Sequence, residues 1–499
     1  MVNKYASGRQ IAGGAAWLMG FKLLDKSIGL ISTLILVRIL SPSDFGLVAM
    51  AVAVVSLTEL MGAFGFDAAL IQRQDAERRH YDTAWTFNVI FGVSIATLLI
   101  VLAVPAASFY GEPRLEMILP ILAVGALFTG FENIGTVAFR KELNFSMEFK
   151  YLLAKRLASF FVVVSLAIYL QSFWALIFGT LAGKLMSVFI SYRLHPYRPR
   201  FALSARADLF HFSKWLFFSN LIQFLQGRSS DFILGRTVGT HGLGLYNVSS
   251  EIAFLPSSEL IAPLNRAVYP AYAQLAKARD HLLARFLEVF GLINLLAFPV
   301  SFGLFCLADL VVKLMLGPQW HEAVPFIQIL GLCGLVSALQ SNMYIVMSAT
   351  GNPKANTYLS ACILVVTLPT VVWASATYGA IGAAYAYFGA AIIGFIGIVF
   401  VFTRYVEAPI SFLLRVMWRP ALASGVMTAL IFLVDDLLIR AGAGLLRMPF
   451  LVGMGALTYS ASVGVLWWLC GRPEGAEKVF MRFVLDKFAI LRKLKYKGN

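Results

Sequence analysis

The sequence predicts an all-α integral membrane protein with about fourteen transmembrane helices. Of its 499 residues, 59% are hydrophobic and 13% are charged, whereas soluble domains carry about 45–50% and about 25%. Apolar runs of 18 or more residues recur along the whole chain, and each is long enough to cross a bilayer. The basic residues also alternate from loop to loop, as they do in proteins that cross the membrane repeatedly.

The predicted helices are separated by recognisable turn chemistry. Ser41-Pro42-Ser43-Asp44 ends the first helix and caps the second. Gly351-Asn352-Pro353 breaks the chain between the tenth and the eleventh. The predicted spans are 14–37, 44–66, 83–105, 116–138, 152–171, 173–193, 213–235, 243–262, 286–307, 323–347, 356–375, 380–402, 418–434 and 449–470.

Lysine and arginine fall mainly on one side of these helices. Of the 41 such residues, 31 lie in the N-terminal segment, the C-terminal tail and the loops that share their side. The opposite loops hold Arg38, Arg114, Arg236, Lys313, Arg440 and Arg447. Because cytoplasmic loops are enriched in these residues, we expect an inner-membrane protein with both termini in the cytoplasm. The same distribution accounts for the net charge of +15, so nucleic acid is not an expected partner.

An internal repeat divides the chain. A shift of 198 residues aligns the first predicted helix with the seventh. Ten identities result between residues 17 and 47, among them Trp17 with Trp215, Arg38 with Arg236 and Gly46 with Gly244. Two six-helix lobes related by a parallel repeat are a known transporter design.

We therefore expect an N-lobe at residues 1–212, with helices one to six, and a C-lobe at 213–402, with helices seven to twelve. Residues 403–499 would add helices thirteen and fourteen and a basic tail. From Gly475 to Asn499 the tail has apolar residues at helical spacing, which predicts an amphipathic helix on the cytoplasmic leaflet. A solvated basic tail is the alternative.

Polar residues form stripes along the predicted helices that the repeat relates. The first helix carries Lys22, Asp25, Lys26, Gly29, Ser32 and Thr33, which follow i, i+3, i+4, i+7 spacing. The seventh carries Asn220, Gln223, Gly227, Arg228, Ser230 and Asp231, while the second adds Glu59 and the eighth adds Asn247 and Glu251. Because a charge inside the bilayer costs at least ~2.5–3.5 kcal/mol, we expect these four helices to enclose a hydrated, charged cavity.

Each charge has two interpretations. The cations could hold an anionic head group, since Lys and Arg both bind phosphate. Alternatively, Lys22 could pair with Asp25, or Lys26 with a neighbouring acid, and so neutralise the interior of the bundle. For Glu132 and Lys184 we favour this structural role. Arg38 and Arg236 lie at the outer ends of their helices, where snorkelling to head groups is the default and gating is the alternative.

Enzyme chemistry is not evident in the sequence. It has no P-loop and no G-x-S-x-G motif. The four cysteines lie in apolar runs, and the six histidines are not spaced like a zinc site. The predicted extracytoplasmic loops are short, which disfavours a membrane glycan polymerase or ligase with a large catalytic outer loop. We therefore expect no catalytic residue, no metal and no cofactor.

Four segments resemble those of bacterial polysaccharide transporters, the Wzx-type flippases. Residues 36–47, LVRILSPSDFGL, resemble the turn between the first two helices of that family. Residues 65–73, GFDAALIQR, are similar to the segment after its second helix, and residues 316–320 and 348–354 are similar to landmarks of its second half. The resemblance extends over nearly the whole chain and is nearest to the colanic acid and succinoglycan subgroup.

That resemblance implies the multidrug/oligosaccharidyl-lipid/polysaccharide exporter superfamily. Its members have two six-helix lobes in a V, with helices one, two, seven and eight lining the cavity. It also implies a transporter that flips an undecaprenyl-pyrophosphate-linked oligosaccharide to the outer leaflet by alternating access, for exopolysaccharide or lipopolysaccharide biosynthesis. The lipid bilayer and polysaccharide polymerase and co-polymerase proteins are the other expected partners.

Two alternatives belong to the same superfamily: a cation-coupled drug or metabolite antiporter, and a peptidoglycan-precursor flippase. A cavity rich in cations favours an anionic lipid, whereas a cavity rich in acids favours cationic drugs. Lys22, Lys26 and Arg228 outnumber Asp25 and Asp231, but Glu59 and Glu251 reverse the sign. The sequence therefore leaves the sign of the cavity open, and these four acids are also candidate proton or cation sites.

Overall fold

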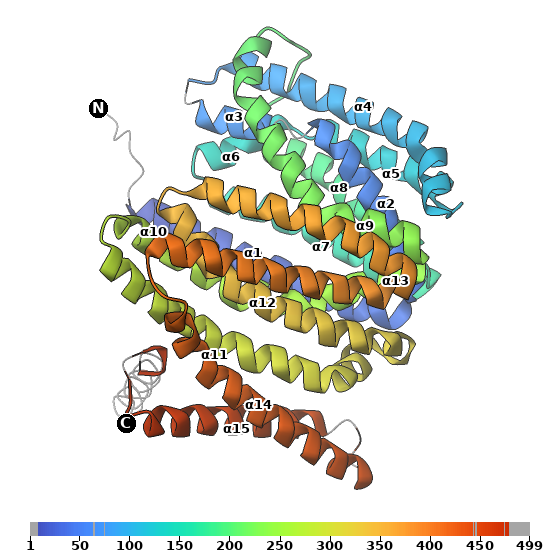
Figure 1. The fold of residues 1–499 in the computed structure, drawn as a ribbon. Coiled ribbons are helices and arrows are strands. Elements are labelled where there is room, and N and C mark those ends of the chain that lie inside the picture. Colours follow the sequence, from blue (N-terminus) through green and yellow to red (C-terminus); the bar gives the residue numbers. More distant parts are fainter. Residues whose placement is uncertain are drawn as a thin grey trace, which may run out of the picture. The chain divides into compact units, whose positions relative to one another are not determined.

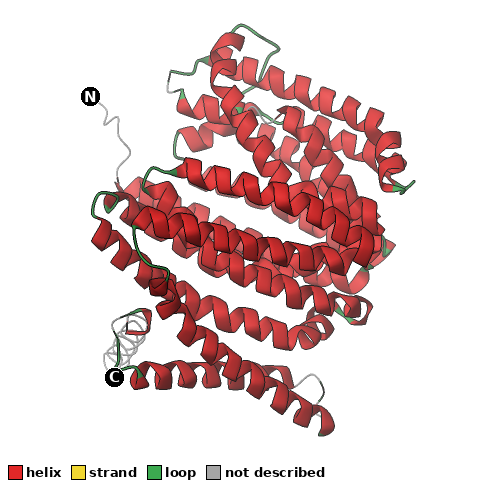
Figure 2. Cartoon of the chain, viewed as in Figure 1, coloured by secondary structure: helices red, strands yellow, loops and turns green. Residues whose placement is uncertain are grey.

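The computed structural model of the chain describes residues 8–62, 65–73, 75–442, 444, 447–473 and 475–478. These residues are helical almost throughout, and none of them lies in a strand (Figure 2). The chain divides into two compact units, Met1–Gly244 and Leu245–Asn499. The all-α class predicted from the sequence is confirmed.

The first unit contains eight α-helices and most of a ninth (Figure 1). They are α1 (Gly8–Ile39), α2 (Pro42–Glu59), α3 (Phe66–Gln72), α4 (Arg78–Tyr110), α5 (Leu115–Gly130), α6 (Val137–Lys141), α7 (Phe145–Leu170), α8 (Trp174–Leu194) and the start of α9 (Arg206–Pro256). The cap of α2 forms as predicted: the Ser41 hydroxyl accepts from the Asp44 N–H, and the Asp44 carboxylate accepts from the Ser41 N–H.

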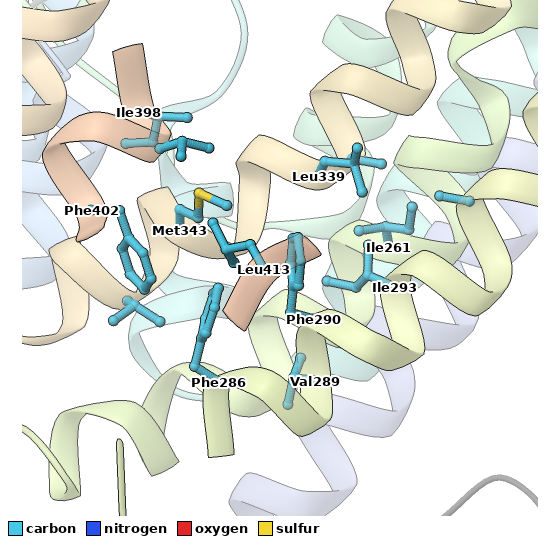
Figure 3. Close-up of a cluster of buried hydrophobic side chains, with 14 of the residues drawn as sticks. Ile261, Phe286, Val289, Phe290, Ile293, Leu339, Met343, Ile398, Phe402 and Leu413 are labelled. Atoms are coloured by element: carbon cyan, nitrogen blue, oxygen red, sulfur yellow. The ribbon is translucent and has the colours of Figure 1, made fainter. Parts of the chain in front are cut away.

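The described part of the second unit contains the end of α9 and six further α-helices. They are α10 (Ala262–Gln274), α11 (Arg279–Val311), α12 (Val324–Ala349), α13 (Pro353–Val406), α14 (Ser411–Arg440) and α15 (Arg447–Leu469). Its core joins α11, α12, α13 and α14 through Phe286, Phe290, Met343, Phe402 and Leu413, all at most 1% exposed (Figure 3). The predicted break at Gly351 separates α12 from α13.

Two of the helices are each broken by one glycine. Gly239 interrupts α9 with φ 71°, and Gly379 interrupts α13 with φ 67°, a left-handed region that side chains other than glycine rarely enter. With α9 and α13 divided there, the described residues contain fourteen helical segments of 16 residues or more. Within the described residues, and with α13 counted as one helix, nine helices are long and apolar enough to cross a membrane, and α5 with α6 could form a tenth span. Among the described residues, the helices with polar stripes, α1 and α9, are not in this set of nine.

Several predicted helix boundaries lie seven or more residues from the observed ones, and two of these concern the same region. The helix predicted at 116–138 ends as α5 at Gly130, because the chain turns at Asn133, whose side-chain oxygen accepts from the Gly135 N–H. The next long helix begins at Phe145 rather than at 152, behind the cap of Asn144. Lys150, Lys155 and Arg156 therefore all lie inside α7.

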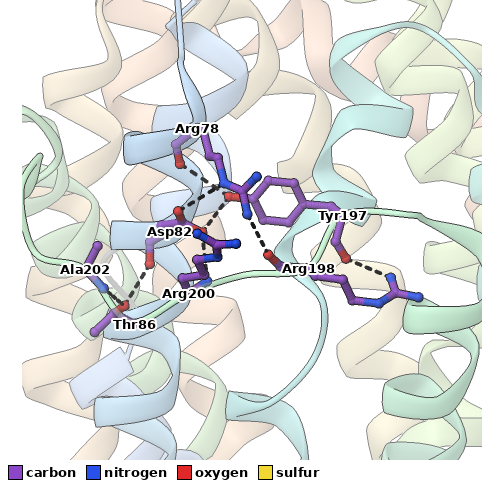
Figure 4. A network of polar contacts seen from close by, with 7 residues as sticks. All are labelled: Arg78, Asp82, Thr86, Tyr197, Arg198, Arg200 and Ala202. Carbon is purple, nitrogen blue, oxygen red and sulfur yellow. Dashed lines mark hydrogen bonds and ion pairs between the residues drawn. The ribbon is translucent and has the colours of Figure 1, made fainter.

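The loop after α8 is hydrogen-bonded to the first turns of α4 (Figure 4). One Asp82 carboxylate oxygen accepts from the Tyr197 hydroxyl at 2.7 Å and from the Arg200 N–H at 2.8 Å. Farther along, the Thr86 hydroxyl accepts from the Ala202 N–H at 3.0 Å. This loop, residues 195–205, is therefore held in an extended path before α9 begins.

Only the first four residues of the predicted amphipathic tail are described. Ala476 and Glu477 are buried in the second unit. The rest of the tail, from residue 479, lies outside the described residues.

Candidate functional site

The polar stripe of α1 is paired with a cation from α7. Lys22 and Lys26 are exposed, whereas Asp25 is half-buried. The Arg156 Nε lies 2.9 Å from the Asp25 carboxylate. Gly29 makes room for this arginine, since a Cβ there would lie 2.7 Å from the Arg156 Nη2. The partner of Asp25 is therefore Arg156 and not Lys22.

Glu59, at the end of α2, is also paired. Its carboxylate lies 3.3 Å from the Lys184 Nζ of α8. The Lys184 stem crosses α5, because a Cβ at Gly125 would lie 3.0 Å from its Cδ. The structural role predicted for Lys184 agrees with this ion pair.

Glu132 lies in a small polar cluster close to α8. It accepts hydrogen bonds from the Tyr151 hydroxyl and, at 2.7 Å, from the Ser187 hydroxyl. Those two hydroxyls are 2.6 Å apart. The structural role predicted for Glu132 agrees with these contacts, although the sequence did not point to Tyr151 or Ser187.

The stripe of α9 carries its own ion pair. The Arg228 Nη1 lies 3.1 Å from the carboxylate of Asp231, whose side chain is only 5% exposed. Residues three apart on a helix lie on the same face, so this spacing brings the two charges together. Asn220 is half-buried, and the side chain of Gln223 lies outside the described residues.

The remaining predicted residues are scattered. Arg38 is exposed, and the Arg236 guanidinium lies 5.9 Å from the centre of the Phe109 ring. Asn247 is half-buried and Glu251 is exposed, and both belong to the second unit. The structure thus joins Asp25 of α1 to α7 and Glu59 of α2 to α8, two helices outside the predicted cavity.

Arg156 is the main residue that sequence reasoning missed. The predicted span 152–171 contains it, but the predicted cavity residues come only from the first, second, seventh and eighth helices. The signal was present, since apolar residues 152–154 precede this region and an apolar run follows it.

Along the stripes of the first unit, the described cations outnumber the acids. The ionisable residues of the stripes and their partners comprise five cations and three acids: Lys22, Lys26, Arg156, Lys184 and Arg228 against Asp25, Glu59 and Asp231. Each acid has a cation within 3.3 Å. This group therefore carries a net positive charge of two.

The second unit contains an apolar groove between α11, α14 and α15, with a volume of about 770 Å³. On α11 its lining runs from Leu295 to Val311, which is about 24 Å along the helix axis and close to the ~30 Å thickness of a bilayer core. Tyr459, Ser460 and Glu477 are the polar side chains among its lining residues.

A buried ion pair lies at one end of this groove. The Arg419 Nη1 is 2.9 Å from the Glu477 carboxylate, and both side chains are 9% exposed. Within the described residues, no group of three or more His, Cys, Asp or Glu side chains could hold a metal ion. The groove of the second unit therefore contains at least one charged side chain, that of Glu477, among its lining residues.

The pKa of His195 is informative because this residue lies in the loop after α8. Burial lowers the pKa of its ring below the ordinary 6.5. The ring Nδ1 accepts from the Tyr197 N–H at 3.1 Å, which requires that nitrogen to be unprotonated. Burial and the bond to Asp82 raise the pKa of the Tyr197 hydroxyl, so Tyr197 remains a donor.

The fold is that of a large class of helical membrane transporters. It superposes on the lipid II flippase MurJ with a TM-score of 0.72 at 14% identity, covering 92% of this chain and 100% of that one. It superposes on a multidrug resistance MATE family transporter with a TM-score of 0.57 at 15% identity, covering 77% and 95%.

The chain belongs to the family of polysaccharide biosynthesis proteins, whose model matches residues 35–325. The lipopolysaccharide biosynthesis protein WzxC of Escherichia coli (strain K12) is 23% identical, over 74% of this chain and 76% of its own length. The succinoglycan biosynthesis transport protein ExoT of Rhizobium meliloti (strain 1021) is 25% identical, over 63% and 65%. The resemblance expected from the sequence motifs is confirmed.

Proposed function

We propose that this protein flips a polyprenyl-pyrophosphate-linked oligosaccharide from the cytoplasmic to the outer leaflet by alternating access. Undecaprenyl pyrophosphate is the carrier that the family resemblance implies, and the product would serve exopolysaccharide or lipopolysaccharide synthesis. Membership of the polysaccharide biosynthesis family and the transporter fold support this proposal. So do the names of two relatives, a polysaccharide transport protein and a lipopolysaccharide biosynthesis protein.

The observation that carries the proposal is the excess of cations in the first unit. Asp25 and Glu59 are each neutralised by a cation from another helix, while Lys22 and Lys26 are exposed on α1. Charges at membrane depth normally face a bundle interior or a water-filled cavity rather than lipid. A hydrated surface with this sign suits a pyrophosphate, and it disfavours the cationic drugs of an antiporter.

The apolar groove of the second unit is suited to the lipid part of the proposed substrate. A polyprenyl chain needs apolar surroundings, whereas the attached pyrophosphate and sugars need water or polar groups. The groove offers apolar walls over most of a bilayer's thickness. We expect the polyprenyl chain to occupy this groove or the adjacent lipid, while the cations of the first unit hold the head group.

The test is transport in proteoliposomes loaded with a polyprenyl-pyrophosphate-linked oligosaccharide and probed with a glycan-specific lectin from outside. Lys22→Gln and Lys26→Gln should slow flipping, and Lys22→Arg should retain more activity than Lys22→Gln. Lys150→Gln is the matched control, because Lys150 is also exposed but lies near the start of α7. Normal rates in both Gln variants would refute the assignment of these lysines to the head group.

The same assay separates the alternatives. A peptidoglycan-precursor flippase would move lipid II faster than the oligosaccharide carrier. A drug antiporter would move neither lipid, and its export of cationic dyes would depend on a proton or sodium gradient. Accumulation of a lipid-linked glycan on the cytoplasmic side of a deletion strain would support the proposed substrate class in cells.

A further inference from the structure

Two repeat-related glycines meet where α2 and the second half of α9 begin. The 198-residue shift that aligns Arg38 with Arg236 also places Gly46 on Gly244. It places the Ser41 cap on Gly239, where α9 breaks. Both copies of the repeat therefore turn at equivalent residues and start a new helix there.

The contact between these two helix starts is reciprocal. A Cβ built on Gly46 would lie 1.7 Å from the Thr240 carbonyl oxygen and 2.9 Å from the Gly244 nitrogen. A Cβ built on Gly244 would lie 1.8 Å from the Pro42 carbonyl oxygen and 3.0 Å from the Gly46 nitrogen. Since the shift maps Pro42 onto Thr240, each copy makes the same contact to the other, as around a local two-fold axis.

No side chain fits between these backbones. Both obstacles are main-chain carbonyl groups, which cannot turn aside as a flexible side chain would. Small residues four apart, such as Thr240 and Gly244, let helices in membranes approach this closely. The attraction available at this separation is van der Waals packing and Cα–H···O contacts, which are weaker than ordinary hydrogen bonds.

The surroundings allow the two helix starts to separate. Gly239, directly before Thr240, has a left-handed backbone, and a Cβ there would meet no atom within 4 Å. The start of α2 is attached elsewhere, because the Asp44 carboxylate accepts from the N–H of Phe173, directly before α8, at 3.3 Å. A weak contact beside the loosely packed helix break at Gly239 can open without disturbing either helix.

We propose that the Gly46–Gly244 contact is the extracytoplasmic gate, closed in this structure, which must separate once in each transport cycle. This proposal rests on the proposed alternating-access function and on the predicted orientation, in which the turns at Ser41 and Gly239 face outward. The gate is closed by backbone alone, so its two glycines are required for closure and not for binding the substrate.

The experiment measures the distance between spin labels at Ser43 and His241, which are themselves equivalent under the repeat. Ser43 is half-buried and His241 is exposed. The labels go onto Ser43→Cys and His241→Cys in a chain whose four native cysteines are replaced by alanine. The purified parent should show a short and a long population in lipid nanodiscs. Gly46→Val and Gly244→Val should each abolish the short population, because the added atoms overlap a carbonyl oxygen.

Gly227→Val is the matched control, since Gly227 lies on α9 and a Cβ there would meet no atom within 4 Å. It should leave the distance distribution as in the parent. Retention of the short population in both Gly46→Val and Gly244→Val would overturn the proposal, and so would a parent that never shows the long one.

A second arm leaves the glycines intact, in case their variants do not fold. A reducible bifunctional thiol reagent joins the two introduced thiols, at positions 43 and 241, in the same chain without the spin labels. The cross-link should stop transport until it is cleaved. Unchanged transport in the cross-linked protein would mean that the Gly46–Gly244 contact need not open, and it would overturn the proposed gate. The distance measurements require no substrate. A protein whose contact opens but which moves no lipid-linked oligosaccharide would therefore refute the proposed function and not the proposed gate.

Discussion

Replacing Glu477 with glutamine removes the charge that faces Arg419 and leaves a cation 9% exposed without its counter-ion. At the observed 2.9 Å and an effective dielectric constant of about 20, the gross attraction is about 6 kcal/mol. Desolvation offsets part of it, and losing one partner of a buried pair typically costs ~3–5 kcal/mol. Because the Arg419 Nη1 is not aligned for a hydrogen bond, we expect a loss of about 3 kcal/mol in the free energy of unfolding.

The assay is unfolding of the purified protein by SDS in mixed micelles. Asp436→Asn is the matched control, since the Asp436–Arg440 pair lies at 2.6 Å but is 57% and 74% exposed, and such pairs are worth about 0–1 kcal/mol. Changing both Arg419 and Glu477 to leucine should recover most of the stability, because neither charge is then left buried alone. If Glu477→Gln costs no more than Asp436→Asn, the pair does not stabilise the second unit.

Three further predictions concern the loop, the groove and the stripe. Lowering the pH below 6.5 should speed hydrogen exchange in residues 195–205. The pKa of His195 is lowered in the folded protein, so its neutral ring stabilises the fold above pH 6.5. This contribution is lost as the pH falls through the folded-state pKa. Gly303→Leu should partly fill the apolar groove and slow flipping. Gly425→Leu is the control and should not slow it, because a Cβ at Gly425 also meets no atom within 4 Å but this residue is outside the groove lining. Equal rates in the two variants would exclude the groove from transport. Arg156→Gln should slow flipping more than Arg156→Lys at equal protein levels, and equal rates would contradict a charge role.

Partners on distant helices could not be predicted from helical spacing. Lys22 was the predicted partner of Asp25 on the same helix, but the observed partner is Arg156, 131 residues away. Similarly, Glu59 pairs with Lys184, 125 residues away. Helical spacing predicts which residues share a face, and it carries no information about which helix covers that face.

Local physics explains what could be read from the sequence alone. Hydrophobic run length depends on the thickness of the bilayer, so the helical membrane class and most spans were predictable, and so was the Ser41 cap. The repeat and the family resemblance were visible as residue identities. Only the tertiary structure decided that Asp25 and Glu59 are neutralised by cations of other helices, and that Gly46 and Gly244 meet backbone to backbone. Both depend on how helices far apart in the chain pack together.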